Sequence, residues 1–86
     1  MVRNKWHLIG NINASSYRKK IFLKLAEKEN TPTQLKNDTD IKISHVSRAL
    51  AELVELKVAI CLTPKLNKNK IYGLTMSGKK IKAALN

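Results

Sequence analysis

Acidic residues are scarce in this sequence and absent from two long stretches of it. Its 86 residues include 17 lysines and arginines but 6 aspartates and glutamates, which gives a net charge of +11. All the acids lie between residues 27 and 55, so residues 1–26 and 56–86 carry only basic charged side chains. A surface without a charged partner usually mixes both signs. The distribution predicts a polyanionic partner and excludes an ordinary neutral domain, with simple solubility as the alternative explanation.

Cysteine and long apolar runs are almost missing as well. The single cysteine, Cys61, excludes an intrachain disulfide and a cysteine-based zinc site, and we expect it to be a structural strand residue. The longest apolar run, residues 58–62, is far too short to cross a bilayer, and residues 1–13 lack the apolar stretch of a signal peptide. We therefore expect a cytoplasmic protein with no membrane partner.

The groups that catalysis or metal binding would need do not occur together. His7 and His45 are distant in the sequence, and no nucleophile, base and orienting group can be recognised as a set. We predict no enzymatic activity, no catalytic residue, no metal, no cofactor and no small-molecule ligand.

The length and composition allow one small globular domain. With 86 residues and 43% hydrophobic side chains, the chain is too short for two domains and too apolar to be disordered. Apolar side chains at helical spacing predict a first helix over residues 15–29, which Ser15 or Ser16 can cap. The preceding residues 1–13 show no clear periodicity, and their apolar side chains, Trp6 among them, form either a dimer contact or a lid on the core.

A second helix is predicted to begin after Thr31. This residue can cap the helix, Pro32 fits its first turn, and Gln34 completes a capping box. We expect the helix to be short, because residues 37–40 are turn-like.

A third helix is predicted over residues 43–57, and Ser44 can cap it. One face is an apolar stripe made of Val46, Leu50, Leu53 and Val54. At about 100° per residue, the opposite face carries Ser44, Arg48, Ala51 and Glu55, and its first turn is flanked by His45 and Ser47. The outward face near the start of this helix is therefore small, polar and basic.

The rest of the chain predicts a hairpin and a last helix. Residues 58–63 and 71–75 are rich in β-formers, the loop of residues 64–70 between them is polar and basic, and residues 76–85 return to helical spacing. Two helices, a turn and a third helix with a polar start describe a helix-turn-helix, and the basic hairpin makes it the winged variety. The predicted fold class is α+β, mainly α: a winged helix-turn-helix with a three-helix core, a two-stranded wing and a C-terminal helix. It would occupy residues 14–86, after an N-terminal arm of residues 1–13 that could contact a second copy.

Individual segments also carry a family resemblance. The segment from Thr39 to Leu53 resembles the turn and recognition helix of winged helix-turn-helix transcriptional regulators. The motif Ser16-Tyr17-Arg18, and residues 61–64 followed by 71–75, are similar to small archaeal members of the ArsR/MarR-like group. The resemblance covers about residues 16–85 and implies a DNA-binding protein.

The sequence departs from that pattern at a few positions. Asp40 and Lys57 stand where members usually have glycine, and aspartate tolerates a left-handed backbone better than most residues. ArsR-type metal sensors bear paired cysteines or clustered histidine and acidic ligands, which this chain lacks. The sensor function therefore does not carry over.

Three functions are compatible with these features. The first is a transcriptional regulator that reads a specific double-stranded DNA sequence as a homodimer on the nucleoid, with helix 43–57 in the major groove and wing 64–70 on the backbone or minor groove. The second is an architectural, chromatin-like protein of the same fold that binds without sequence preference. The third is a protein-interaction module, which a charge of +11 disfavours unless its partner is acidic. The candidate DNA contacts are Ser44, His45, Ser47, Arg48, Arg18, Lys19, Lys42, Lys65, Lys68 and Lys70.

Overall fold

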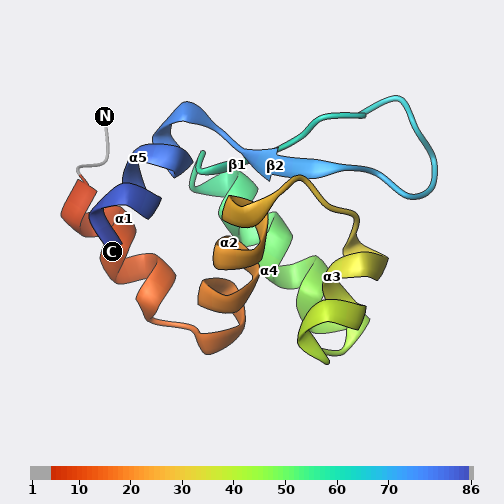
Figure 1. Ribbon diagram of the computed structural model, residues 1–86, viewed down its shortest axis with the longest axis horizontal. Coiled ribbons are helices and arrows are strands. Elements are labelled where there is room, and N and C mark those ends of the chain that lie inside the picture. The colour runs from red at the N-terminus through yellow and green to blue at the C-terminus, as the bar shows by residue number, and fades with distance from the viewer. Residues whose placement is uncertain (1–4, 86) are drawn as a thin grey trace.

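Five helices and a two-stranded sheet make up residues 5–85, the part of the chain that the computed structural model describes (Figure 1). In chain order they are α1 (Lys5–Asn13), α2 (Ser16–Glu27), α3 (Pro32–Thr39), α4 (Ile43–Glu55), β1 (Ala59–Cys61), β2 (Tyr72–Leu74) and α5 (Met76–Leu85). Residues 1–4, which belong to the expected arm, and residue 86 lie outside the described residues. The expected fold class is confirmed: three helices, a two-stranded wing and a last helix follow one another as predicted.

Side-chain caps fix the starts of two helices. The Ser15 hydroxyl accepts a hydrogen bond from the Arg18 N–H at 3.2 Å, and the Thr31 hydroxyl accepts one from the Gln34 N–H at 3.1 Å. The expected capping box is not completed, because the Thr31 N–H donates to the Asn30 side-chain oxygen at 3.2 Å, while the Gln34 side chain donates to Asp38 at 2.8 Å. That bond lies within α3, which continues through Thr39, so the turn expected over residues 37–40 is helical except at its last residue.

Two left-handed residues bound the segment that contains α4. Asp40 ends α3 with a φ of 60°, and Lys57 follows the helix with a φ of 66°. These are the two positions at which similar proteins usually have glycine, so the backbone conformation is kept without it. The predicted cap at Ser44 is wrong: Lys42 is the N-cap residue, no side chain caps the helix, and α4 ends at Glu55 instead of residue 57.

The hairpin gains a third backbone segment that the sequence did not reveal. β1 and β2 pair in antiparallel register, with Ile60 opposite Gly73. On the other edge of β2, the Asn30 and Tyr72 backbones exchange two hydrogen bonds of 2.9 and 2.8 Å. Asn30 is buried, and its side-chain oxygen accepts a hydrogen bond from the Thr31 N–H. This bridge attaches the wing to the segment between α2 and α3.

One hydrophobic core joins all these elements. Its most deeply buried side chains come from α1 to α4 and from the start of the hairpin: Phe22, Ile12, Ile21, Leu35, Leu53, Val46 and Val58. Leu8 and Ile12 of α1 belong to this core, so residues 5–13 form a helix packed against α2 and α5 where no periodicity was evident. Trp6, on the same helix, is 73% exposed. Figure 1 shows α1 and α5 together at one end of the molecule, while the loop between the strands projects from the other end.

The last helix sits against the backbone that precedes β1. The Thr75 N–H donates to the Val58 carbonyl at 3.1 Å, and the Thr75 hydroxyl donates to the Lys57 carbonyl at 2.7 Å. A Cβ atom at Gly78 would lie 2.1 Å from the Val58 oxygen, so only glycine allows this approach. Within residues 5–85, no helix combines the length and apolar character that a membrane span requires.

Candidate nucleic-acid interface

The first half of α4 presents an exposed stripe. Its members recur at intervals of three and four residues and are all exposed: Ser44, Ser47, Arg48 and Ala51. On the opposite side, Val46, Ala49, Leu50 and Leu53 are buried in the core. Lys42, at the N-cap position, is also exposed. The predicted helix phase is confirmed, and the exposed surface of the first two turns, which also includes Ile43, carries no acidic side chain.

Arg48 has no partner within residues 5–85. Glu52, one turn further along α4, is spaced to form an ion pair with it. In the structure Glu52 is instead paired with Arg18, whose Nε lies 3.3 Å from the Glu52 Oε1. The guanidinium of Arg48 is therefore exposed and available to an external acceptor.

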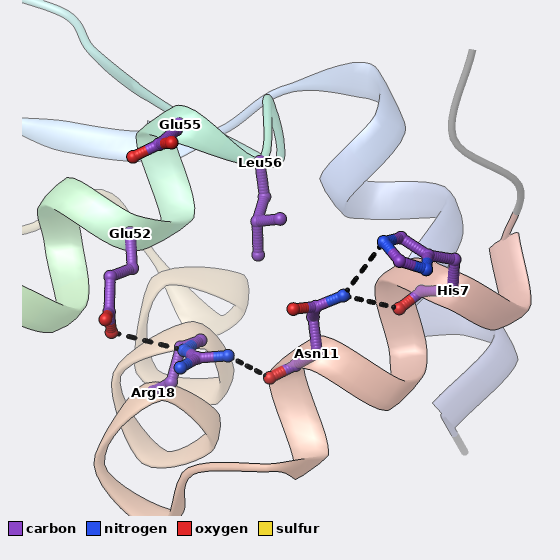
Figure 2. A pocket seen from close by; sticks show the side chains of 6 residues that line it. All are labelled: His7, Asn11, Arg18, Glu52, Glu55 and Leu56. Atoms are coloured by element: carbon purple, nitrogen blue, oxygen red, sulfur yellow. Dashed lines mark hydrogen bonds and ion pairs between the residues drawn. The ribbon is translucent and has the colours of Figure 1, made fainter. Parts of the chain in front are cut away.

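Arg18, a candidate phosphate contact, has its polar partners inside the protein. Its side chain is 17% exposed, and besides the Glu52 ion pair it donates to the Asn11 carbonyl. These contacts join α1, α2 and α4 around a pocket of about 310 Å³ that His7, Glu55 and Leu56 also line (Figure 2). The adjacent Lys19 is exposed on α2 and remains a candidate.

His45 is half-buried on the flank of α4 that faces α2. Its imidazole stacks on the Tyr17 ring, with 4.7 Å between centroids and 19° between planes. Tyr17 was not among the candidate residues. The sequence places it one residue after the start of α2, but no local signal there indicates a contact with a residue 28 positions away.

The wing is a tethered basic loop. The Leu62 N–H donates to the Ile71 carbonyl at 2.7 Å, and the Ile71 N–H donates to the Thr63 hydroxyl at 2.9 Å, so the base of the loop is closed by two bonds. Near the tip, Asn69 adopts a left-handed φ of 56°. Among the lysines, Lys65 and Lys68 are exposed and Lys70 is half-buried. The loop thus holds positive charge away from the helical core (Figure 1).

Cys61 and Tyr72 are cross-strand neighbours at the base of the wing. Burial raises the pKa of the Tyr72 hydroxyl above its ordinary value, and the electrostatic interaction and hydrogen bond with Cys61 raise it further. Among residues 5–85, histidine, cysteine and acidic side chains do not gather in groups of three or more that could hold a metal ion.

Comparison with solved structures identifies the fold. The chain is similar to NMB1585, a MarR family regulator from Neisseria meningitidis, with a TM-score of 0.77 over 91% of this chain and 19% sequence identity. This chain has the winged helix-turn-helix fold. It spans 56% of the length of that regulator. No family model matches the sequence, and a search of curated proteins finds no significant similarity.

The winged helix-turn-helix assigns a place to each element. α3 and α4 are its two helices, the turn at Asp40 lies between them, and the hairpin is its wing. In this fold α4 is the second helix of the helix-turn-helix, and its exposed stripe faces away from the core.

Proposed function

We propose that the protein is a double-stranded DNA-binding transcription regulator that reads sequence with the first turns of α4. The observation that carries this proposal is the exposed, acid-free stripe of α4 with Arg48 left unpaired, in a chain of net charge +11. An α-helix fits the major groove, where an arginine fork can pair with a guanine edge. Ser44 and Ser47 lie on the same stripe, where their hydroxyl groups can bond base edges or phosphates.

The lysines around this stripe would bind the DNA backbone. Lys42 precedes α4, Lys19 lies on α2, and the wing carries Lys65, Lys68 and Lys70. The flexible stem and point charge of lysine suit phosphates, which carry no sequence information. The wing would contact the backbone or the minor groove beside the α4 site.

A two-fold symmetric site would require two copies of this small domain. We propose a homodimer that acts on the nucleoid in the cytoplasm, and that has no enzymatic activity. Trp6 supports a contact between copies, because a large apolar ring exposed on a helix outside the wing and α4 is suited to burial against a partner.

The same fold could instead bind DNA without reading its sequence. The observation favouring this alternative is the charge composition, since lysines far outnumber arginines and none of them lies within α4. An architectural protein would hold phosphates at every site with similar affinity.

Selection of bound duplexes from a random pool separates the two functions. An enriched motif supports the regulator, and a bound pool without any enriched motif supports the architectural protein. The association constant for a random duplex should also fall as the salt concentration rises. A plot of the logarithm of this constant against the logarithm of the salt concentration should have a slope of about −4, for about five phosphate contacts. A slope near zero would contradict DNA binding in either form.

A further inference from the structure

Two side-chain pairs hold α4 against α2. Tyr17 stacks on His45, and the neighbouring Arg18 pairs with Glu52. His45 and Glu52 are seven residues apart, which is two helical turns, so both lie on the same flank of α4. Consecutive residues of α2 thus contact α4 at two levels of one flank.

The Tyr17–His45 pair borders the exposed stripe of α4. A hollow of about 190 Å³ lies between the two helices, and its lining includes Tyr17, His45 and Arg48 together with Arg18 and Glu52. Tyr17 is 43% exposed, so its ring is accessible from the same side. The stacked rings and the unpaired guanidinium of Arg48 therefore surround one opening.

We propose that Tyr17 is a positioning residue of the DNA interface, which holds His45 in the geometry in which it meets DNA beside Arg48. This inference rests on the proposed function. A free histidine side chain samples several rotamers, and fixing one of them on DNA would weaken binding. Stacking on Tyr17 fixes the ring before DNA arrives, and an imidazole ring nitrogen can then serve a base edge or a phosphate oxygen.

The groups that face His45 favour this role over a mainly structural one. Glu52 is paired with Arg18, so the carboxylate nearest this flank has a partner other than the imidazole. The ring itself has no hydrogen bond within residues 5–85, although it is half-buried. A stacked ring with unused polar atoms at the edge of a basic surface is suited to an external ligand.

A double-mutant cycle tests the inference. Affinities would be measured for Tyr17→Phe, Tyr17→Leu, His45→Ala and the Tyr17→Leu/His45→Ala double variant, on the duplex selected from the pool and on a random duplex. Tyr17→Phe keeps the ring and should bind like the unchanged protein. Tyr17→Leu should bind the selected duplex roughly three- to tenfold more weakly, with a smaller effect on the random duplex. In the His45→Ala background it should have no further effect.

A measurement on the free protein accompanies the cycle. The stack should shift the ring-proton NMR signals of His45, and His7 provides the reference as the other histidine in the chain. The shift should persist in Tyr17→Phe and disappear in Tyr17→Leu. Thermal unfolding of each variant shows that the domain stays folded.

Each failure has a separate meaning. Tyr17 acts independently of His45, and the inference is wrong, in either of two cases. In the first, the fold-losses of affinity caused by Tyr17→Leu and His45→Ala multiply in the double variant. In the second, Tyr17→Phe weakens binding to both duplexes equally. If the unchanged protein does not distinguish the duplexes, the sequence-reading function is wrong, and the inference falls with it.

Discussion

Replacing Gly78 with alanine should destabilise the protein, whereas the same change at Gly10 should stabilise it. Both glycines lie within helices, Gly10 in α1 and Gly78 in α5. Alanine is the better helix former by about 1 kcal/mol, so propensity favours both substitutions equally. The surroundings differ: a Cβ at Gly10 meets nothing within 4 Å, but at Gly78 it would lie 2.1 Å from the Val58 oxygen.

The size of the effect at Gly78 follows from what it meets. The Val58 oxygen is a backbone atom, so no rotamer change can relieve the overlap, and it also accepts the hydrogen bond from Thr75. To restore an ordinary contact, α5 would have to retreat by about 1 Å. Overpacking of this kind costs about 1–3 kcal/mol, and weakening the hydrogen bond costs about 1 kcal/mol. After subtracting the gain in helix propensity, we expect a net loss of about 2 kcal/mol.

Thermal unfolding of the unchanged protein and both variants checks this prediction. In a domain of this size, 1 kcal/mol shifts the Tm by about 4–8 °C. Gly78→Ala should therefore unfold about 10 °C lower, and Gly10→Ala about 5 °C higher. A Gly78→Ala variant as stable as Gly10→Ala would refute the close contact between α5 and the Val58 carbonyl.

Three further predictions concern DNA binding, backbone strain and assembly. Arg48→Ala should cost about 1–3 kcal/mol of binding free energy on the selected duplex and much less on a random one. Lys68→Ala should weaken binding to both duplexes equally, and it should make the slope of the salt dependence less steep by about one unit. Titrations of the two duplexes at one salt concentration decide this. An equal loss of affinity on both duplexes for Arg48→Ala would mean that Arg48 contacts a phosphate and does not read a base. Lys57→Gly should raise the free energy of unfolding by about 0.5–1 kcal/mol, because it removes a Cβ from a left-handed residue, and Asp40→Gly should gain less. Urea unfolding measures both, and a loss at Lys57 would contradict the assigned backbone. Trp6→Glu should convert the proposed homodimer to a folded monomer, because Trp6 is 73% exposed and would lie at the contact between copies. Sedimentation tests this, and an unchanged protein that is monomeric at high concentration would disprove the dimer.

The N-terminal segment shows where sequence patterns were insufficient. The sequence predicts an arm over residues 1–13. It does not indicate α1, because the two buried residues of this helix, Leu8 and Ile12, do not make a long apolar stripe. Their burial also bears on experiments: removing the segment would take two side chains from the core, so a point substitution at Trp6 is the cleaner test of assembly.

Local signals determined the elements that the sequence predicted correctly. The caps at Ser15 and Thr31, and the apolar stripe of α4, involve residues within one or a few turns of each other, so the sequence alone specifies them. The same stripe fixed which face of α4 is outward. The acid-free stretches are likewise a property of the sequence, and they indicate a polyanionic partner whatever the fold.

Only the tertiary structure decided which side chains are available on that face. Arg18 and Glu52 are 34 residues apart, and the packing of α2 on α4 brings them together. Their ion pair gives Arg18 a partner within the protein and leaves Arg48 free of the acid nearest to it in the sequence. The same packing stacks Tyr17 on His45. Periodicity gives the face of a helix, but a pairing between helices depends on how they cross, which no local pattern encodes.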